Sequence, residues 1–159
     1  MKTRSIAEIK KELQHIDKQE LIDHCLRLAK YKTDNKGLLS YLLFNQQQLQ
    51  DALVEMKEQL SIDFSEVPPL DKHYSKKSIR KVLRTTLKYA KYIQQTEIEI
   101  ELLIHFCKEY KKRGLSFSHQ PIILNIYFAQ IKKIEKLIAS LHEDLQYDYN
   151  KEVEALMLL

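Results

Sequence analysis

The chain has 159 residues, of which 44% are hydrophobic and 30% charged, and its net charge is only +4. This balance excludes an intrinsically disordered chain, and the length is sufficient for one domain with a real core. Because Gly37 and Gly114 are the only glycines, the chain also lacks the glycine-rich turns that hold phosphates in dinucleotide-binding folds and P-loop enzymes.

The N-terminus is charged from its first residues and lacks the apolar stretch of a signal peptide, and no run reaches the length of a membrane span. Cys25 and Cys107 are the only cysteines, and each has apolar neighbours. They are far from the paired spacing of a zinc site or a disulfide scaffold, so we interpret them as small buried hydrophobic residues. We expect a cytoplasmic protein without a metal, a cofactor or a membrane partner.

Apolar side chains recur at three- and four-residue steps from residue 6 onward, which predicts amphipathic helices. Ser5 and Glu8 have the spacing of a capping box and predict the start of a short first helix. Asp17 and Glu20 repeat this signal and predict a second helix that reaches about Tyr31.

Asp34, Asn35 and Gly37 are expected to break the chain, before a third helix over 38–43 and a fourth over 49–60. A boundary follows, because consecutive prolines lack backbone donors and force the preceding residue out of the helical region. It consists of Val67, Pro68, Pro69 and Leu70. We interpret residues 65–70 as a boundary between two lobes of a single domain that spans residues 1–159.

The second half begins with a predicted long helix from about Ser75 to Gln94. Thr96 is the expected cap of the next helix, which should end near Arg113 and be stopped by Gly114. Further helices are expected over 121–142 and 152–158, and no alternating strand pattern competes with them. The predicted fold is all-α, with six to eight helices in an irregular bundle or a short stack of helix pairs.

The opening IKKELQHIDKQELIDHCLRLAKY, residues 9–31, resembles the start of small all-helical bacterial proteins gathered in families of unknown function. The resemblance covers the N-terminal third of the chain. It implies a helical fold and no known activity, and it therefore assigns no catalytic residue.

The positive charge is concentrated on one predicted helix, since residues 70–95 hold eight lysines and arginines and one acid. Seven of these cations are the candidate binding residues, and all but Lys76 recur at three- and four-residue steps opposite an expected core face of Ile79, Val82, Leu83 and Leu87. They are Lys76, Lys77, Arg80, Lys81, Arg84, Lys88 and Lys91. Like charges at this spacing repel one another, and either solvent or the negative charge of a partner can offset the repulsion.

We interpret the chain as a non-enzymatic interaction module that presents this basic helix to another macromolecule; the sequence does not identify the partner, and an acidic protein surface is one candidate. One alternative is nucleic-acid binding through residues 72–91, for which Tyr74, Tyr89 and Tyr92 could stack on bases. Another is a solvated face that pairs with the chain's own acids. Membrane docking is not expected, because the aliphatic face of the helix is assigned to the core.

A second alternative is an enzyme that uses residues 141–149, where His142, Glu143, Asp144, Tyr147 and Asp148 gather proton-transfer groups. Such a site requires Asp144 or Asp148 to meet groups of other helices, and Glu101 and His105 are the candidates. The competing interpretation is a polar helix end with internal hydrogen bonds.

The C-terminal run Ala155, Leu156, Met157, Leu158 and Leu159 has no polar side chain. Apolar residues at consecutive positions face every side of a helix, so one surface of the core should not bury all of them. A symmetric homodimer through this segment is the expected way to cover the rest.

Overall fold

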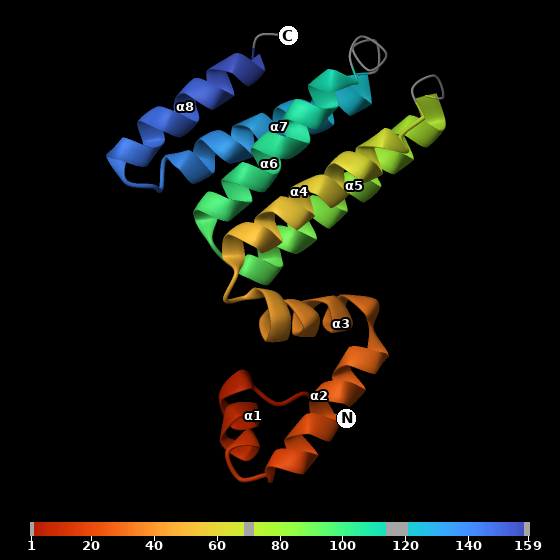
Figure 1. Ribbon diagram of the computed structural model, residues 1–159, viewed down its shortest axis with the longest axis vertical. Coiled ribbons are helices and arrows are strands. Elements are labelled where there is room, and N and C mark those ends of the chain that lie inside the picture. The colour runs from red at the N-terminus through yellow and green to blue at the C-terminus, as the bar shows by residue number, and fades with distance from the viewer. Residues whose placement is uncertain (1, 69–71, 114–120, 158–159) are drawn as a thin grey trace. The chain divides into compact units, whose positions relative to one another are not determined.

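The computed structural model describes residues 2–68, 72–113 and 121–157, and it describes the backbone but not the side chains of residues 72 and 73. In these ranges the regular structure consists of eight α-helices and one π-helical turn, without a strand (Figure 1). The all-α fold is thereby confirmed. Over the same ranges, no helix combines the length and the apolar character needed to cross a bilayer.

The chain divides into two compact units, residues 1–47 and 48–159. The division lies before the expected lobe boundary at 65–70, of which Pro69 and Leu70 are outside the described residues. The helices that flank Pro68 pack against each other within the second unit. Pro68 therefore lies between the two helices of a helical hairpin.

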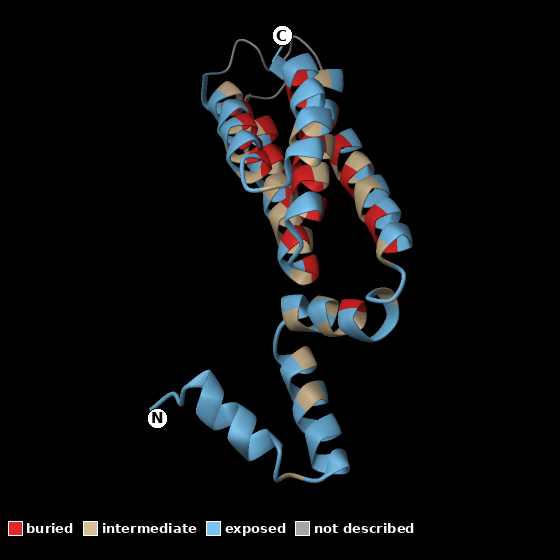
Figure 2. Cartoon of the chain, turned by 90° about the vertical axis from the view of Figure 1, so that its left-hand side faces the viewer, coloured by how far each residue is buried: buried red, intermediate tan, exposed pale blue. Residues whose placement is uncertain are grey.

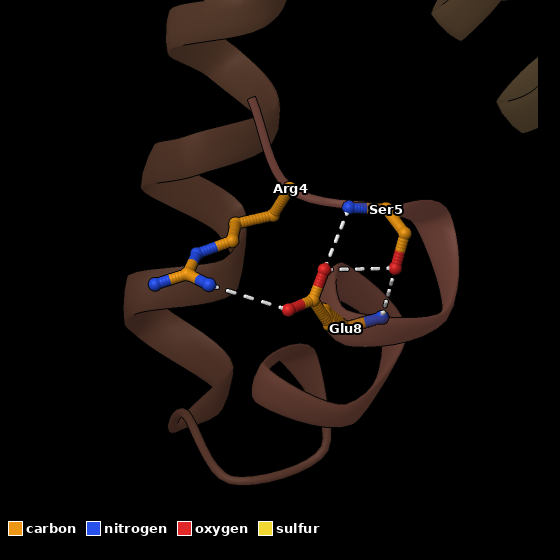
Figure 3. Close-up of polar contacts among 3 residues, drawn as sticks. All are labelled: Arg4, Ser5 and Glu8. Carbon is orange, nitrogen blue, oxygen red and sulfur yellow. Dashed lines mark hydrogen bonds and ion pairs between the residues drawn. The ribbon is translucent and has the colours of Figure 1, made fainter. Parts of the chain in front are cut away.

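The N-terminal unit contains α1 (Ile6–Leu13), α2 (Lys18–Tyr31), α3 (Thr33–Ser40) and a π-helical turn (Tyr41–Asn45). The predicted capping box is present: the Glu8 backbone N–H donates to Ser5 Oγ, and the Ser5 backbone N–H donates to the Glu8 carboxylate at 2.9 Å (Figure 3). Asp17 caps α2 by accepting from the Glu20 N–H at 2.9 Å. Both predicted helix starts are confirmed.

The expected break at residues 34–37 is wrong. The chain turns at Lys32, whose backbone is extended, and α3 runs through Asp34, Asn35 and Gly37. The Asn35 side-chain amide donates to the Leu28 carbonyl oxygen at 2.9 Å. A side chain that predicts a turn instead satisfies a carbonyl near the end of α2, where helices leave such groups without partners.

The C-terminal unit holds the core of the molecule. Its helices are α4 (Leu49–Ser65), α5 (Lys72–Ile93), α6 (Thr96–Lys112), α7 (Pro121–Ile138) and α8 (Glu143–Met157). The central helix is α6, which packs against each of the other four and buries side chains on most of its circumference. Aromatic rings link these helices, since Phe64 of α4 lies 5.1 Å from Phe106, and Tyr110 lies 4.7 Å from Tyr127 of α7, between ring centroids.

Helices α4, α6 and α8 run in the same direction, and α5 and α7 run against them (Figure 1). Lys57 bonds to Glu101, and Lys108 bonds to Glu152, each across 44 positions. The C-terminal unit is therefore built from successive antiparallel helix pairs in constant register, with α8 as the last layer.

The connections between helices differ from expectation in detail. Gln94 has a φ of 57°, in the left-handed region, and only Gln94 and Gln95 join α5 to α6. The residue before α6 is Gln95, so the expected capping role of Thr96 is wrong, because Thr96 already lies inside the helix. Near the C-terminal end of α4, the Arg113 guanidinium donates to the Phe64 carbonyl oxygen. Gly114 lies outside the described residues.

Candidate functional site

The basic surface lies on α5, a helix of 22 residues with one buried face. That face includes Ile79, at 0% exposure, and Val82, at 3%, as the sequence predicts. We call the seven cations of this helix the basic stripe: Lys76, Lys77, Arg80, Lys81, Arg84, Lys88 and Lys91. Except for Lys76 and Lys88, which are half-buried, all of these residues are exposed.

The basic stripe has few internal partners. No described acid lies within ion-pair distance of Lys77, Arg80, Lys81 or Arg84. Lys88 is the member with a neighbour on its own helix, since its ammonium lies 5.9 Å from the centre of the Tyr89 ring. Pairing with acids of the described residues does not account for these four cations, so within that part of the chain their repulsion is left to solvent or to a partner.

Leu83 and Leu87, which we call the leucine pair, are not in the core as expected. Both are half-buried, and they line a surface hollow of about 630 Å³ together with Lys76, Lys77, Arg80 and Arg84. Their helical positions turn them from the centre of the buried face toward the stripe, so cationic and aliphatic groups share one concave surface. The position of Leu83 and Leu87 beside the cations can be predicted from helical periodicity only when the centre of the buried face of α5 is known.

The tyrosines of α5 are not equally accessible. Tyr74 is 59% exposed, whereas Tyr89 and Tyr92 are half-buried, with their ring centroids 6.5 Å apart. A nucleic-acid surface needs rings that are open to bases along the strand. Tyr74 alone meets this condition on α5.

The acidic segment at 141–149 is split by the structure. His142 and Asp144 are highly exposed and interact with each other at 3.4 Å, and Glu143 and Tyr147 are also exposed. Asp148, by contrast, lines a cleft with Glu101 and His105 of α6. The expected convergence therefore holds for Asp148 and fails for Asp144.

This cleft, of about 420 Å³, lies between α4, α6 and α8. Lys57 and Lys108 each form an ion pair at 2.6 Å, with Glu101 and Glu152 respectively. Tyr149 is the other polar group of the cleft that sequence reasoning missed. Its position follows from the 44-residue register, which no sequence motif signals.

His105 is the cleft residue with the best potential for proton transfer. Burial lowers its pKa below the usual 6.5, although nearby Glu109 opposes this shift, so the imidazole is neutral at physiological pH. Its Nε2 lies 2.9 Å from Ser61 Oγ, and the Ser61 hydroxyl donates to the Lys57 carbonyl oxygen at 3.1 Å. In this arrangement the imidazole donates to the serine, which is the reverse of what nucleophile activation requires.

Metal binding and thiol chemistry find little support in the described parts of the chain. They contain no group of three or more His, Cys, Asp or Glu residues that could hold a metal ion. Cys107 is fully buried, and burial raises the pKa of its thiol to about 12. Such a thiol stays protonated, in agreement with the structural role expected for it, whereas Cys25 is half-buried.

Comparison of the chain with protein families, with curated proteins and with solved structures gave no match in any of the three. The similarity of residues 9–31 to small helical bacterial proteins stays a prediction. Function is therefore inferred from the surfaces of this chain, of which the hollow on α5 has the most distinctive chemistry.

Proposed function

We propose that this protein is an interaction module whose α5 surface binds an acidic, amphipathic helical segment of a partner protein. The observation that carries the proposal is the hollow in which the leucine pair lies among Lys76, Lys77, Arg80 and Arg84. A partner helix with leucine-like side chains on one stripe and carboxylates beside it would match both components.

The energetics favour such a partner over solvent alone. Exposed cations three and four residues apart destabilise a helix by a few tenths of a kcal/mol per pair, and carboxylates placed opposite them remove this cost. The leucine pair adds apolar area that only a protein segment would cover well. Electrostatic attraction to the stripe would mainly accelerate association, and burial of the leucines would slow dissociation.

Nucleic acid is the competing partner, and Tyr74 is the observation that favours it. Phosphates can use the cations of the stripe but gain nothing from two aliphatic side chains. The leucine pair therefore discriminates between the two partners.

The test is affinity capture from an extract of the organism that makes the protein. Three baits are compared: the unchanged chain, R80E/R84E, and the matched control K132E/K136E, which makes the same charge change at exposed lysines of α7. Both double variants reverse charges four residues apart on one helix. We expect a protein that is retained after nuclease treatment, lost with R80E/R84E and kept with the control.

The segment responsible is then tested as a synthetic peptide against the unchanged chain and against L83A/L87A. Loss of the leucine pair should weaken peptide binding by at least about tenfold, since each buried leucine contributes on the order of 1.5–3 kcal/mol. Capture that vanishes with nuclease, or oligonucleotide binding unaffected by L83A/L87A, would favour nucleic acid. Equal capture by all three baits contradicts a functional α5 surface.

A further inference from the structure

Tyr41, in the π-helical turn, is the one buried residue among the described residues of the N-terminal unit. No side chain of α1, α2 or α3 is buried, whereas buried residues are frequent in the C-terminal unit (Figure 2). Every leucine and isoleucine of α1 and α2 is more than a third exposed, from Leu21 at 38% to Ile6 at 81%. Amphipathic helices of this kind gain most of their stability from covering the apolar face. Although α2 packs against α3, the apolar side chains of α1 and α2 stay largely uncovered within this unit.

A hollow of about 630 Å³ lies within this unit, lined by α1, the residues on either side of it, and His24 of α2. Ile9, Leu13 and Ile16 provide its apolar surface. Its charged lining has both signs, with Arg4 and Lys11 as the bases and Glu8 and Glu12 as the acids. The hollow thus offers apolar contact surrounded by balanced charge.

We infer that this hollow is the contact surface between two copies of the chain, in which the α1 helix of each copy packs into the hollow of the other. The first argument is size. The unit has 47 residues, close to the length below which a domain needs disulfides, metals or oligomerisation to obtain a core. The only cysteine of this unit is Cys25, and a second copy supplies the missing apolar surface.

The second argument is charge. A two-fold contact brings the same patch against itself, so the patch must be complementary to itself. Glu8, Lys11 and Glu12 lie on α1, and Arg4 lies just before its cap. When the second α1 runs antiparallel, basic groups of one copy face acids of the other, which satisfies this requirement. A strongly acidic or basic partner would find no such match here.

The third argument is area. The seven leucines and isoleucines of α1 and α2 together expose on the order of 600 Å², taking about 180 Å² for each fully exposed residue. A standard interface buries roughly 800 Å² per partner, of which somewhat more than half is apolar. Of these seven residues only Ile9 and Leu13 line the hollow, so a dimer contact of standard size extends from the hollow onto the exposed apolar side chains of α2.

The C-terminal segment, where the sequence predicts self-association, exposes less apolar surface among its described residues than α1 and α2 do. Leu156 is only 3% exposed, and its carbonyl oxygen accepts from the Tyr127 hydroxyl at 2.6 Å. Met157 is exposed, and Leu158 and Leu159 lie outside the described residues. Among the described residues of this run, Leu156 packs within its own unit and Met157 stays exposed, so the core buries only part of the run, as expected.

The test is the mass of the full-length chain in solution, measured by light scattering and analytical ultracentrifugation over a concentration series. We expect a dimer at tens of micromolar. The variant I9A/L13A should raise its dissociation constant at least about tenfold, because both side chains lose apolar contact across the interface. Alanine is the best helix former, so dissociation cannot be attributed to loss of α1.

The matched control is V54A/I62A, which truncates two side chains of α4 that are each 53% exposed. This variant, a chain lacking residues 158–159, and R80E/R84E should all keep the dimer, the last because the inference is independent of the α5 surface. A full-length chain that stays monomeric overturns the inference. So does a dimer that survives I9A/L13A, or one that the control or the C-terminal deletion abolishes.

Discussion

The Lys57 ammonium lies 2.6 Å from the Glu101 carboxylate, and one helical turn further on Ser61 contacts His105 at 2.9 Å, each pair joining α4 to α6 across 44 positions. Two consecutive contacts with the same offset fix the register of these parallel helices. The Lys57–Glu101 pair is only 30% exposed on either side, so solvent screens it less than an ordinary surface pair.

Replacing Lys57 by methionine should lower the free energy of unfolding by about 1 kcal/mol, toward the upper end for partly exposed pairs, since the aliphatic stem is retained and the charge is lost. Urea unfolding measures the change. Arg4→Met provides the comparison, because its pair with Glu8 is 72% and 53% exposed and should contribute little. Equal losses of unfolding free energy in the two variants would show that the Lys57–Glu101 pair stabilises the fold no more than an exposed surface pair does.

Tyr149 should titrate abnormally late, because burial, and then the charge of nearby Glu101, raises its pKa to about 12. Removing that charge in Glu101→Gln should move the pKa back toward 10. The alkaline ultraviolet difference spectrum reports the titration, and Tyr149→Phe identifies which of the nine tyrosines is responsible. An unchanged titration in Glu101→Gln would mean that burial and the charges of Glu97 and Glu152, without Glu101, cause the shift.

Tyr149 also makes stability depend on pH. Its pKa is higher in the folded chain, so the folded state keeps a proton that the unfolded state loses above about pH 10. The contribution is complete below that pH and should disappear as the pH rises toward 12. Tyr149→Phe, which cannot ionise, should reduce the loss of stability over this interval.

Cys107 should be inert toward thiol reagents, because it is fully buried and its thiol pKa is raised to about 12 by burial. In Cys25→Ser, the remaining thiol should react with a disulfide reagent only as fast as the chain opens. In Cys107→Ser, half-buried Cys25 should react much faster. Rapid labelling of Cys107 in the native chain would contradict the packing around α6.

Stability should be distributed very unevenly between the two units. Phe106→Ala removes a fully buried ring that packs on Phe64, and it should cost about 3–5 kcal/mol. Leu26→Ala, at a position 46% exposed, should cost less than about 1 kcal/mol under conditions where the chain is monomeric. Similar costs at the two positions would show that α2 is buried in the monomer.

Local signals in the sequence were sufficient for the helix starts. Ser5 and Glu8, and likewise Asp17, act on backbone groups three residues away, so spacing alone reveals them. The prediction of a break at residues 34–37 was wrong because an Asn side chain can either form a turn or bond to the end of a neighbouring helix. Asn35 does the second, and this depends on the position of the α2 end that its amide reaches. The prediction that Thr96 caps the next helix was also wrong, because α6 begins one residue earlier than expected and its cap position is Gln95.

The sites required information that is not local. Outward cations on α5 follow from helical periodicity, but the exposure of Leu83 and Leu87 depends on which neighbours cover the helix. The meeting of Asp148 with Glu101 and His105 depends on the register between α6 and α8. Tertiary packing determines both the exposure of the leucine pair and the register between α6 and α8, and neither can be predicted from the periodicity of a single helix.

The short connection between α5 and α6 limits what α5 can do. With Gln94 in a left-handed turn and only one residue after it, the chain has no slack through which the end of α5 could move away from α6. Together with the packing of α5 against α4, α6 and α7, this connection holds the backbone of the helix in place before any encounter, so binding would require no backbone reorganisation of α5. The ordering entropy of complex formation would fall on the incoming segment, so preorganising that segment, for example by a covalent staple, should increase its affinity more than any rigidification of α5.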